Sequence, residues 1–574
     1  MKHYHAKQLY RAVACAIFAG IVAAPFAAQT AYALPIEGAN AAANKTEADI
    51  STSGAVMDIA GKTDHNILKW ENFSVEKDEK VRFDGGNQTR DYLNLVTGEG
   101  ASNIYGTIEG GRNVYLVNPH GILFAKGSEV NTGALYLSTA NPADIAAATN
   151  TFKTNGTSPL SATAQMGDVL NLGTVKASKL YIEGKNVTVL NTDDVTDANG
   201  TALTGANVTI RSEDAPHIGY DVANTTTRNF TVNGATVSKN VSDYKNANTS
   251  KSASTRGWVV QNLSGTAHTD YDYMRVHDVY ELQHMDVNRD GGQRKTYGRY
   301  ILAGDIDASE TKNWTEGFQP IGNDGSRNPS DFVGRFDGAR HTITGLTVQQ
   351  GDTAYNEHRY RGLFGSIKDG AVIENVSLKG ASVSGNENVG GIVGSAEQHS
   401  IIRNVSFSGE VHGLGNHAYD NSYGGIAGAI SDGSRIENAY HEGIVEGHKA
   451  VGGIVGYAVF SSTVQNVRNA GKVSGNEVLG GIAGAVEEYS SVRNAVQTGD
   501  VEQRTGQTDP TVGGVVGWLK DSTLSHAVWK EGSVKDGNGA LIRNGIGKNQ
   551  GNTTVSDVKE HSLDDMKKAA TYAG

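Results

Sequence analysis

The residues most suggestive of metal chemistry lie at 286–291, which read Asp-Val-Asn-Arg-Asp-Gly. Oxygen-bearing side chains at alternate positions, followed by glycine, form the first half of a calcium-binding loop. The twelfth position, which should supply a bidentate glutamate, is Tyr297, and the ninth is Arg294, whose charge would repel a cation. A polar turn is therefore the simpler interpretation, weak calcium binding at 286–291 stays open, and no metal site is predicted.

Sequence motifs for covalent or metal-assisted catalysis do not occur in this chain. G-x-S-x-G, H-E-x-x-H, C-x-x-C and G-x-x-x-x-G-K-[ST] are all missing. His277 and His284 are seven residues apart, a spacing with no metal-ligand meaning by itself. Carboxylates are numerous, but an acid pair cannot be assigned from sequence when its members come from different coils. We expect no catalytic residue, no cofactor and no enzyme activity.

A sharp turn between two apolar runs indicates the architecture. Val114–Val117 is rich in β-branched and aromatic residues, as strands are. The chain then passes through Asn118, Pro119, His120 and Gly121, residue types that favour turns, before a second apolar run begins at Ile122. Two short strands joined by such a corner predict one coil of a β-solenoid.

The segments around this turn resemble, in order and spacing, the N-terminal secretion domain of two-partner secretion exoproteins. These are the filamentous haemagglutinin-type adhesins and haemolysins. The resemblance covers roughly residues 45–140. The matching segments are ILKWENF (67–73), VRF (81–83), LNLVTG (93–98), IYGTIEG (104–110), NVYLVNPHGILF (113–124) and VNTGALYLST (130–139).

The resemblance implies a secretion motif at Asn94, Asn118, Pro119, His120 and Gly121. The family usually carries a second asparagine where this chain has His120, which puts a role for that amide in partner recognition in doubt. The resemblance also implies an outer-membrane β-barrel transporter as partner. The product would be secreted from, or displayed on, a Gram-negative-type bacterium after passing through the periplasm.

The N-terminus predicts a signal peptide over residues 1–33. A basic start and an apolar run precede an A-x-A cleavage site at Ala31 and Ala33. Cys15, the only cysteine, lies inside this leader, so no disulfide is expected. The leader contains three basic residues and no acidic residue. After its removal the mature chain has 47 basic and 62 acidic residues, which gives a net charge of −15. This acidity argues against a nucleic-acid partner.

The C-terminal half contains an internal repeat. Paired glycines at 390–391, 424–425, 452–453, 480–481 and 513–514 recur at intervals of 34, 28, 28 and 33 residues, and each opens a G-[IV]-[AV]-G box. This pattern and the segment before it resemble bacterial surface proteins with GLUG-type repeats. An asparagine stands thirteen residues after the second glycine, with an earlier copy after Gly362 and His526 one residue early in the last copy. The asparagines are Asn375, Asn404, Asn438, Asn466 and Asn494.

These features predict an all-β fold, an elongated right-handed parallel β-helix, with short helices at 276–285 and near the C-terminus. Stacking coils at a strand spacing of about 4.8 Å buries a face that a single repeat cannot bury. The asparagines are then expected to form a structural hydrogen-bonded ladder. The predicted divisions are the signal peptide (1–33), secretion domain (34–145), further coils with polar loops (146–258), lead-in (259–350), repeats (351–535) and a tail that may be truncated (536–574).

Three functions fit this organisation. The first is an exported adhesin whose N-terminal domain acts as secretion signal and folding nucleus, with the repeats as stalk and binding surface for host or bacterial glycans or proteins. The second is a haemolysin or contact-toxin scaffold, which a distinct C-terminal domain would favour. The third is a polysaccharide-active β-helix enzyme, which needs clustered charged residues on one face.

Overall fold

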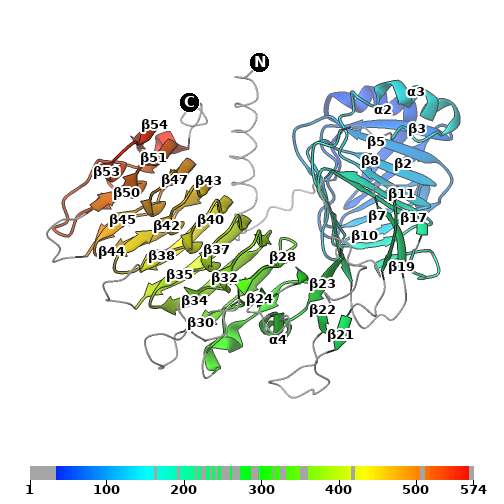
Figure 1. The fold of residues 1–574 in the computed structure, drawn as a ribbon. Coiled ribbons are helices and arrows are strands. Elements are labelled where there is room, and N and C mark those ends of the chain that lie inside the picture. The colour runs from blue at the N-terminus through cyan, green and yellow to red at the C-terminus, as the bar shows by residue number, and fades with distance from the viewer. Residues whose placement is uncertain are drawn as a thin grey trace. The chain divides into compact units, whose positions relative to one another are not determined.

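The computed structural model describes residues 34–160, 164–189, 194–203, 205–213, 216–220, 228–232, 235–239, 244–246, 259–261, 272–285, 295–296, 298–314, 317–322, 331–349, 360–414, 421–504 and 511–567. Its internal contacts divide the chain into two units (Figure 1). We call the described residues of 34–245 and 272–275 the N-terminal unit, and those of 246–261 and 276–567 the repeat unit.

Three sheets form the N-terminal unit, and each coil gives one short strand to each sheet. Pairing between coils is parallel, except for the antiparallel pairs at the ends, β1 with β2 and β19 with β20. The first sheet holds β1 (Ala48–Ser53), β2 (Val56–Gly61), β4 (Lys80–Phe83), β7 (Thr107–Glu109), β10 (Glu129–Asn131), β13 (Thr174–Lys176) and β16 (Val195–Thr196). The second holds β3 (His65–Trp70), β5 (Asp91–Val96), β8 (Asn113–Val117), β11 (Ala134–Ser138), β14 (Leu180–Gly184), β17 (Gly205–Ser212), β19 (Arg228–Val232) and β20 (Ala235–Lys239). The third holds β6 (Ser102–Ile104), β9 (Ile122–Phe124), β12 (Val169–Asn171), β15 (Val187–Val189), β18 (His217–Tyr220) and β23 (Asp272–Val276).

The interior of the N-terminal unit consists of in-register apolar columns. On the first sheet Val81, Ile108, Val130 and Val175 occupy one register position in successive coils, and each is at most 2% exposed. Because each β-branched side chain covers the one before it, burial grows with every coil added.

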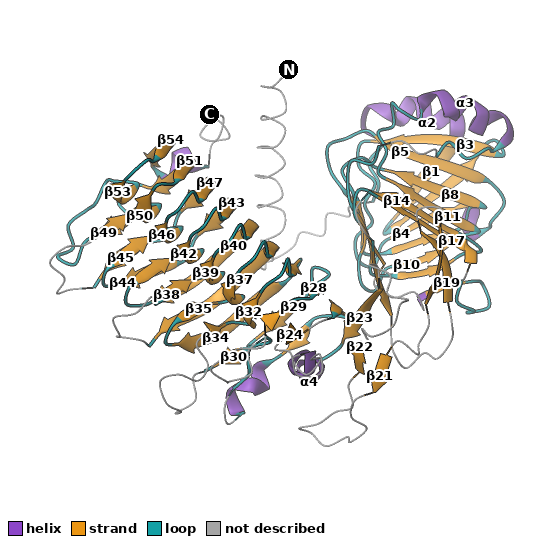
Figure 2. Ribbon diagram, viewed as in Figure 1, coloured by secondary structure: helices purple, strands orange, loops and turns teal. Residues whose placement is uncertain are grey.

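Helices cover part of the second sheet of the N-terminal unit (Figure 2). They are η1 (Gly38–Asn40), α2 (Ala41–Glu47) and α3 (Ala146–Asn155), with η2 (Asp84–Gly86) in a turn. Helix α3 is inserted between β11 and β12, and its Phe152 packs in a second apolar cluster that includes Leu93, Tyr115 and Val117. That cluster explains why every residue of β5 is buried, on both faces of the sheet. The sequence did not predict α2 or α3.

The repeat unit is a second three-sheet solenoid, and its strands follow one another in chain order from green to red in Figure 1. The longest sheet holds β25 (Arg299–Leu302), β26 (Ile306–Asp307), β28 (Arg335–Asp337), β29 (Thr342–Thr344), β30 (Thr347–Val348), β33 (Val372–Glu374), β34 (Ser377–Gly385), β37 (Ile401–Gly413), β40 (Arg435–Glu446), β43 (Thr463–Asn469), β44 (Lys472–Gly475), β47 (Ser491–Gln497), β48 (Val501–Gln503), β51 (Thr523–Lys530), β52 (Val534–Lys535) and β54 (Thr554–His561). The second holds β24 (Lys295–Thr296), β27 (Asp331–Phe332), β32 (Phe364–Ile367), β36 (Val393–Ala396), β39 (Ala427–Ile430), β42 (Val455–Ala458), β46 (Ala483–Val486), β50 (Val516–Lys520) and β53 (Ile546–Gln550). The third holds β31 (Tyr360–Arg361), β35 (Asn388–Gly390), β38 (Ser422–Gly424), β41 (Ala450–Gly452), β45 (Val478–Gly480) and β49 (Thr511–Gly513). Two further short strands are β21 (Tyr244–Asn246) and β22 (Val259–Gln261).

The paired glycines stand where the chain passes from the third sheet to the second. A Cβ on Gly453 would lie 2.3 Å from the backbone oxygen of Gly481 in the next coil, closer than any side chain permits. Gly425 stands in the same relation to Gly453. The glycine pairs therefore allow successive coils to approach at this corner, which is the reason for the period seen in the sequence.

Short helices occupy the predicted places. Helix α4 (Val279–His284) begins after Asp278, whose side chain accepts hydrogen bonds from two backbone N–H groups, and η6 (Ser309–Asn313) follows it. Helix α5 (Leu563–Met566) begins after Ser562, whose hydroxyl accepts from the backbone N–H of Asp565. The predicted parallel β-helix is confirmed, and none of the helices in the described residues is long and apolar enough to span a membrane.

Candidate functional site

Asn118 is the central residue of the predicted secretion turn, and its side chain is fully buried. Its Nδ2 donates to the backbone oxygen of Gly100 at 2.9 Å and to the Ser102 hydroxyl at 3.0 Å, both in the preceding coil. Its Oδ1 accepts from the backbone N–H of His120 at 2.9 Å. Its backbone N–H donates to the oxygen of Ser138 in the next coil at 2.9 Å. Asn118 therefore joins three successive coils.

The rest of the turn divides into a buried and an accessible part. Gly121 has φ +108°, and a Cβ there would approach the backbone oxygen of Asp168 to 3.1 Å. Only glycine occupies this conformation without strain. Pro119 is half-buried and His120 is exposed at the tip of the turn.

Asn94, the remaining residue of the predicted motif, lies inside the solenoid on β5. Its Oδ1 accepts from the Trp70 indole N–H at 3.0 Å, and its Nδ2 donates to the backbone oxygen of Tyr115 at 3.0 Å. Both side-chain groups are thus satisfied between neighbouring coils. In the folded unit, Pro119 and His120 are the residues of this motif that a partner can reach.

A buried carboxylate, which sequence analysis missed, joins the same coils on the outer face of the second sheet. Asp91 accepts hydrogen bonds from the Arg112 guanidinium at 2.8 and 2.9 Å and from Asn113 Nδ2 at 2.8 Å. His65 Nδ1 lies 2.7 Å from Oδ2 of Asp91. Burial by itself would raise the pKa of Asp91, but these bonds outweigh it and hold the pKa below its usual range.

Helix α2 protects the first edge of the second sheet. Asn44 forms two hydrogen bonds with the backbone of Lys69 on edge strand β3, at 2.8 and 2.9 Å, as a neighbouring strand would. The Glu47 carboxylate accepts from the backbone N–H of Ile67 at 2.9 Å and pairs with Lys153 of α3 at 2.5 Å. Such cover prevents strand addition at this edge.

The repeat unit places the five predicted asparagines in one column. From Asn404 onwards, each Nδ2 donates to the Oδ1 of the asparagine in the preceding coil, at 2.9 to 3.1 Å. The bonds run from Asn404 to Asn375, Asn438 to Asn404, Asn466 to Asn438, and Asn494 to Asn466.

Backbone conformation explains why this position takes asparagine. All five have φ between +53° and +56°, in the left-handed region, where asparagine is tolerated better than most residues. The column begins at Asp337, whose carboxylate accepts from Asn375 Nδ2 at 3.0 Å.

His526 and Asp557 occupy the same register and conformation in the last two coils. Their φ angles are +51° and +52°. His526 is one residue early in the sequence because Leu519 and Thr523 are four residues apart, whereas their register partners Val486 and Ser491 are five residues apart. Sequence analysis missed Asp557 because its coil carries no paired glycines.

A second ladder, of serines, also escaped the sequence analysis. These serines stand nine residues after the second glycine, or eight in the last coil, and that constant offset was a usable signal. They are at most 4% exposed, and a serine hydroxyl accepts from the backbone N–H of the serine in the preceding coil at 3.1 to 3.2 Å at three of the steps. The serines are Ser400, Ser434, Ser462, Ser490 and Ser522.

Several predictions fall outside the described residues. The signal peptide with Ala31 and Ala33 lies there, and so does the partial calcium loop at 286–291. The extra residues of the two longer repeats fall at 415–420 and 505–510, and these segments also lie outside the described residues.

Comparison with known families agrees with the geometry of both units. Residues 36–270 match the TPS secretion domain, and residues 385–411 match the GLUG motif. The coiled first unit, with its buried asparagines, is thus a two-partner secretion domain, followed by a solenoid with GLUG motif repeats. This domain is characteristic of exoproteins of the two-partner secretion type. Proteins of this type are secreted by Gram-negative bacteria through the periplasm, and the domain implies an outer-membrane transporter as partner.

Similar curated proteins match only part of the chain. The heme/hemopexin-binding protein of Haemophilus influenzae is 32% identical over 151 residues, which is 26% of this chain and 16% of that protein. Halomucin of Haloquadratum walsbyi is 33% identical over 133 residues, which is 22% of this chain and 1% of that protein.

Two solved structures show a more distant likeness. The HMW1 secretion domain from Haemophilus influenzae is 12% identical with a TM-score of 0.22, covering 91% of this chain and 98% of that one. A putative immunoglobulin A1 protease from Bacteroides ovatus is 20% identical with a TM-score of 0.40, covering 52% of this chain and 86% of that one. At these scores neither structure defines the fold or function of this chain.

Proposed function

We propose that this protein is an adhesin-type exoprotein, exported through an outer-membrane two-partner transporter and then released or held at the cell surface. The observation that carries the proposal is the TPS secretion domain over residues 36–270. The repeats serve as stalk and binding surface for glycans or proteins of other cells. We propose no catalytic role, and a toxin scaffold is the less favoured alternative.

The buried asparagines support a specific export mechanism. Asn94 and Asn118 have no exposed surface in the folded unit, so a transporter can read their side chains only before the coils have stacked. Stacking outside the cell then satisfies both amides and buries the apolar columns. A chain that has folded in this way cannot slip back through the transporter, which biases translocation outwards. Unpaired strand edges of the unfolded domain could meanwhile pair with the transporter.

Export can be tested by replacing Asn118 and Gly121 together with alanine. The variant leaves Gly100 and Ser102 without a donor and places a side chain at a positive φ, so coil stacking should fail. We expect several-fold less protein in the medium and a matching increase in the periplasm. His120→Ala is the matched control, because it changes the exposed tip and keeps the buried bonds.

The two variants separate the exposed tip of the turn from its buried residues. Normal export of His120→Ala together with lost export of Asn118→Ala/Gly121→Ala supports an export role for the buried residues and not for the tip. Unchanged release of the double variant contradicts the proposed route.

A further inference from the structure

Four aromatic residues with exposed surface lie in three consecutive coils of the repeat unit. Tyr457 and Trp518 lie partly exposed on the outer face of the second sheet. Phe460 is 56% exposed and Tyr489 is 79% exposed, at the tips of the turns after β42 and β46. Binding surfaces are enriched in aromatic side chains.

Register places Tyr457 and Trp518 in one line along the solenoid. Successive coils carry Ala429, Tyr457, Ala485, Trp518 and Lys548 at this position. The two rings are therefore two strand spacings apart, about 9.6 Å. In this column alanine separates the two rings and also stands on the far side of Tyr457.

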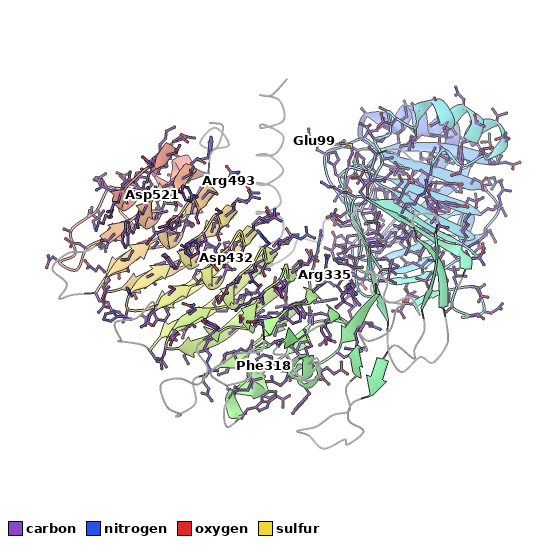
Figure 3. The ribbon with its side chains drawn as sticks, in the orientation of Figure 1. Glu99, Phe318, Arg335, Asp432, Arg493 and Asp521 are labelled. Atoms are coloured by element: carbon purple, nitrogen blue, oxygen red, sulfur yellow. The ribbon has the colours of Figure 1, made fainter. Side chains whose placement is uncertain are left out.

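The turns with Phe460 and Tyr489 border this line. They belong to the row of turns marked by Asp432 and Asp521 in Figure 3. The backbone N–H of Tyr489 donates to the oxygen of Asp521 at 2.9 Å, which fixes the adjacent turns in the same row. We call Tyr457, Trp518, Phe460 and Tyr489 the aromatic surface.

Charged groups of both signs lie beside the aromatic surface. Lys520 lies 3.9 Å from Glu487 and 3.7 Å from Glu488. Lys548 lies over the Trp518 ring at 5.1 Å from its centroid. The Trp518 indole nitrogen is buried and has no acceptor among the described residues, so it does not face a ligand. The surface thus offers partly exposed aromatic rings beside charged groups of both signs.

We propose that the aromatic surface binds a neutral polysaccharide. Rings repeated along a straight axis match a linear chain of sugar rings, whose C–H faces stack on aromatic faces. Sugar hydroxyls would meet the polar groups of Glu487 and Lys520. The inference rests on the proposed adhesin function and identifies where, and on what class of ligand, the repeats act.

Affinity electrophoresis of the purified full chain tests this proposal. Native gels would contain galactomannan, mixed-linkage β-glucan or dextran as neutral probes, and alginate as an acidic comparator. We expect a neutral polymer to retard the wild type, and Tyr457→Ala/Trp518→Ala to raise its dissociation constant at least about tenfold. Tyr457→Phe should bind nearly as well as the wild type, since it keeps the ring.

The design excludes misfolding as a trivial explanation. The same column already holds Ala429 and Ala485, so alanine is compatible with the coil at 457 and 518. Tyr105→Ala is the matched control, because Tyr105 is 41% exposed and lies in the N-terminal unit.

Three outcomes would overturn the proposal: no neutral polymer retards the wild type, the double variant binds equally well, or only alginate binds. A failure of export would instead appear in the medium-to-periplasm ratio, which this assay does not measure. The two proposals therefore fail separately.

Discussion

At the scale of single residues, two independent requirements favour asparagine at each position of the column. Asn466 has φ +56°, and its amide also donates to Asn438 and accepts from Asn494, at 3.1 and 2.9 Å. Glycine would satisfy the backbone conformation, and glutamine could supply an amide, but asparagine combines both requirements.

Substitution at Asn466 should separate these two contributions. Asn466→Ala removes both hydrogen bonds and leaves an ordinary side chain at a positive φ, so we expect a loss of about 2 kcal/mol in the unfolding free energy of the repeat unit. Asn466→Gly removes the bonds but relieves the backbone, and should cost about 1 kcal/mol. Urea denaturation followed by hydrogen exchange of peptides from 435–497 measures both. Equal losses would show that backbone conformation does not select asparagine here.

At the scale of elements, the α3 insertion fastens the outer face of the second sheet. Phe152 is fully buried, with ring centroids 5.5 Å from Tyr115 and 5.8 Å from His65 in edge-to-face arrangements. Its neighbour Lys153 reaches Glu47 of α2. One inserted helix therefore contacts strands of two coils and the helix at the N-terminal edge.

Truncation of Phe152 should loosen this arrangement. We expect Phe152→Ala to lower the unfolding free energy of the N-terminal unit by about 3 kcal/mol, as for other buried phenylalanines. Exchange in peptides from 91–138 should accelerate accordingly. Thr151→Ala, at an exposed position of the same helix, should change stability by less than about 0.5 kcal/mol. If the two variants behave alike, α3 does not stabilise the sheet.

At the scale of the molecule, the repeating features were predictable and the unique ones were not. Paired glycines and the asparagine offset recur, so the sequence revealed the repeat solenoid and its column. Helix α3 occurs once and has little apolar periodicity, since only Phe152 of its residues is buried. The Asp91 cluster also escaped notice, because its members come from different coils and are distant in sequence. Which residues of the secretion motif are buried could not be predicted either, because this depends on the direction in which each side chain points within its coil.

The interior of the repeat unit is continuous, so a charge at one point should destabilise the whole stack of coils. His441 is fully buried, between Phe407 and Asn469 of the neighbouring coils, and its Nδ1 lies 2.6 Å from Asn469 Oδ1. The position is polar in the next two coils as well, where Asn469 Nδ2 donates to Gln497 Oε1 at 2.8 Å. Burial lowers the pKa of His441 from 6.5 to about 4, although the hydrogen bond that its Nδ1–H donates to Asn469 Oδ1 raises the pKa.

This lowered pKa predicts acid sensitivity of the repeat unit. Between pH 6.5 and about 4 the unfolded chain binds a proton at His441 that the folded chain does not, so stability falls as the pH falls through this window. The full loss is about 3 kcal/mol, reached near pH 4. His441→Gln resembles the residues of the next coils and cannot titrate, so its stability relative to wild type should rise by that amount on acidification. Urea denaturation of both proteins at pH 7, 5.5 and 4 measures the difference, and a constant difference would mean that His441 is not held neutral by the stacked coils.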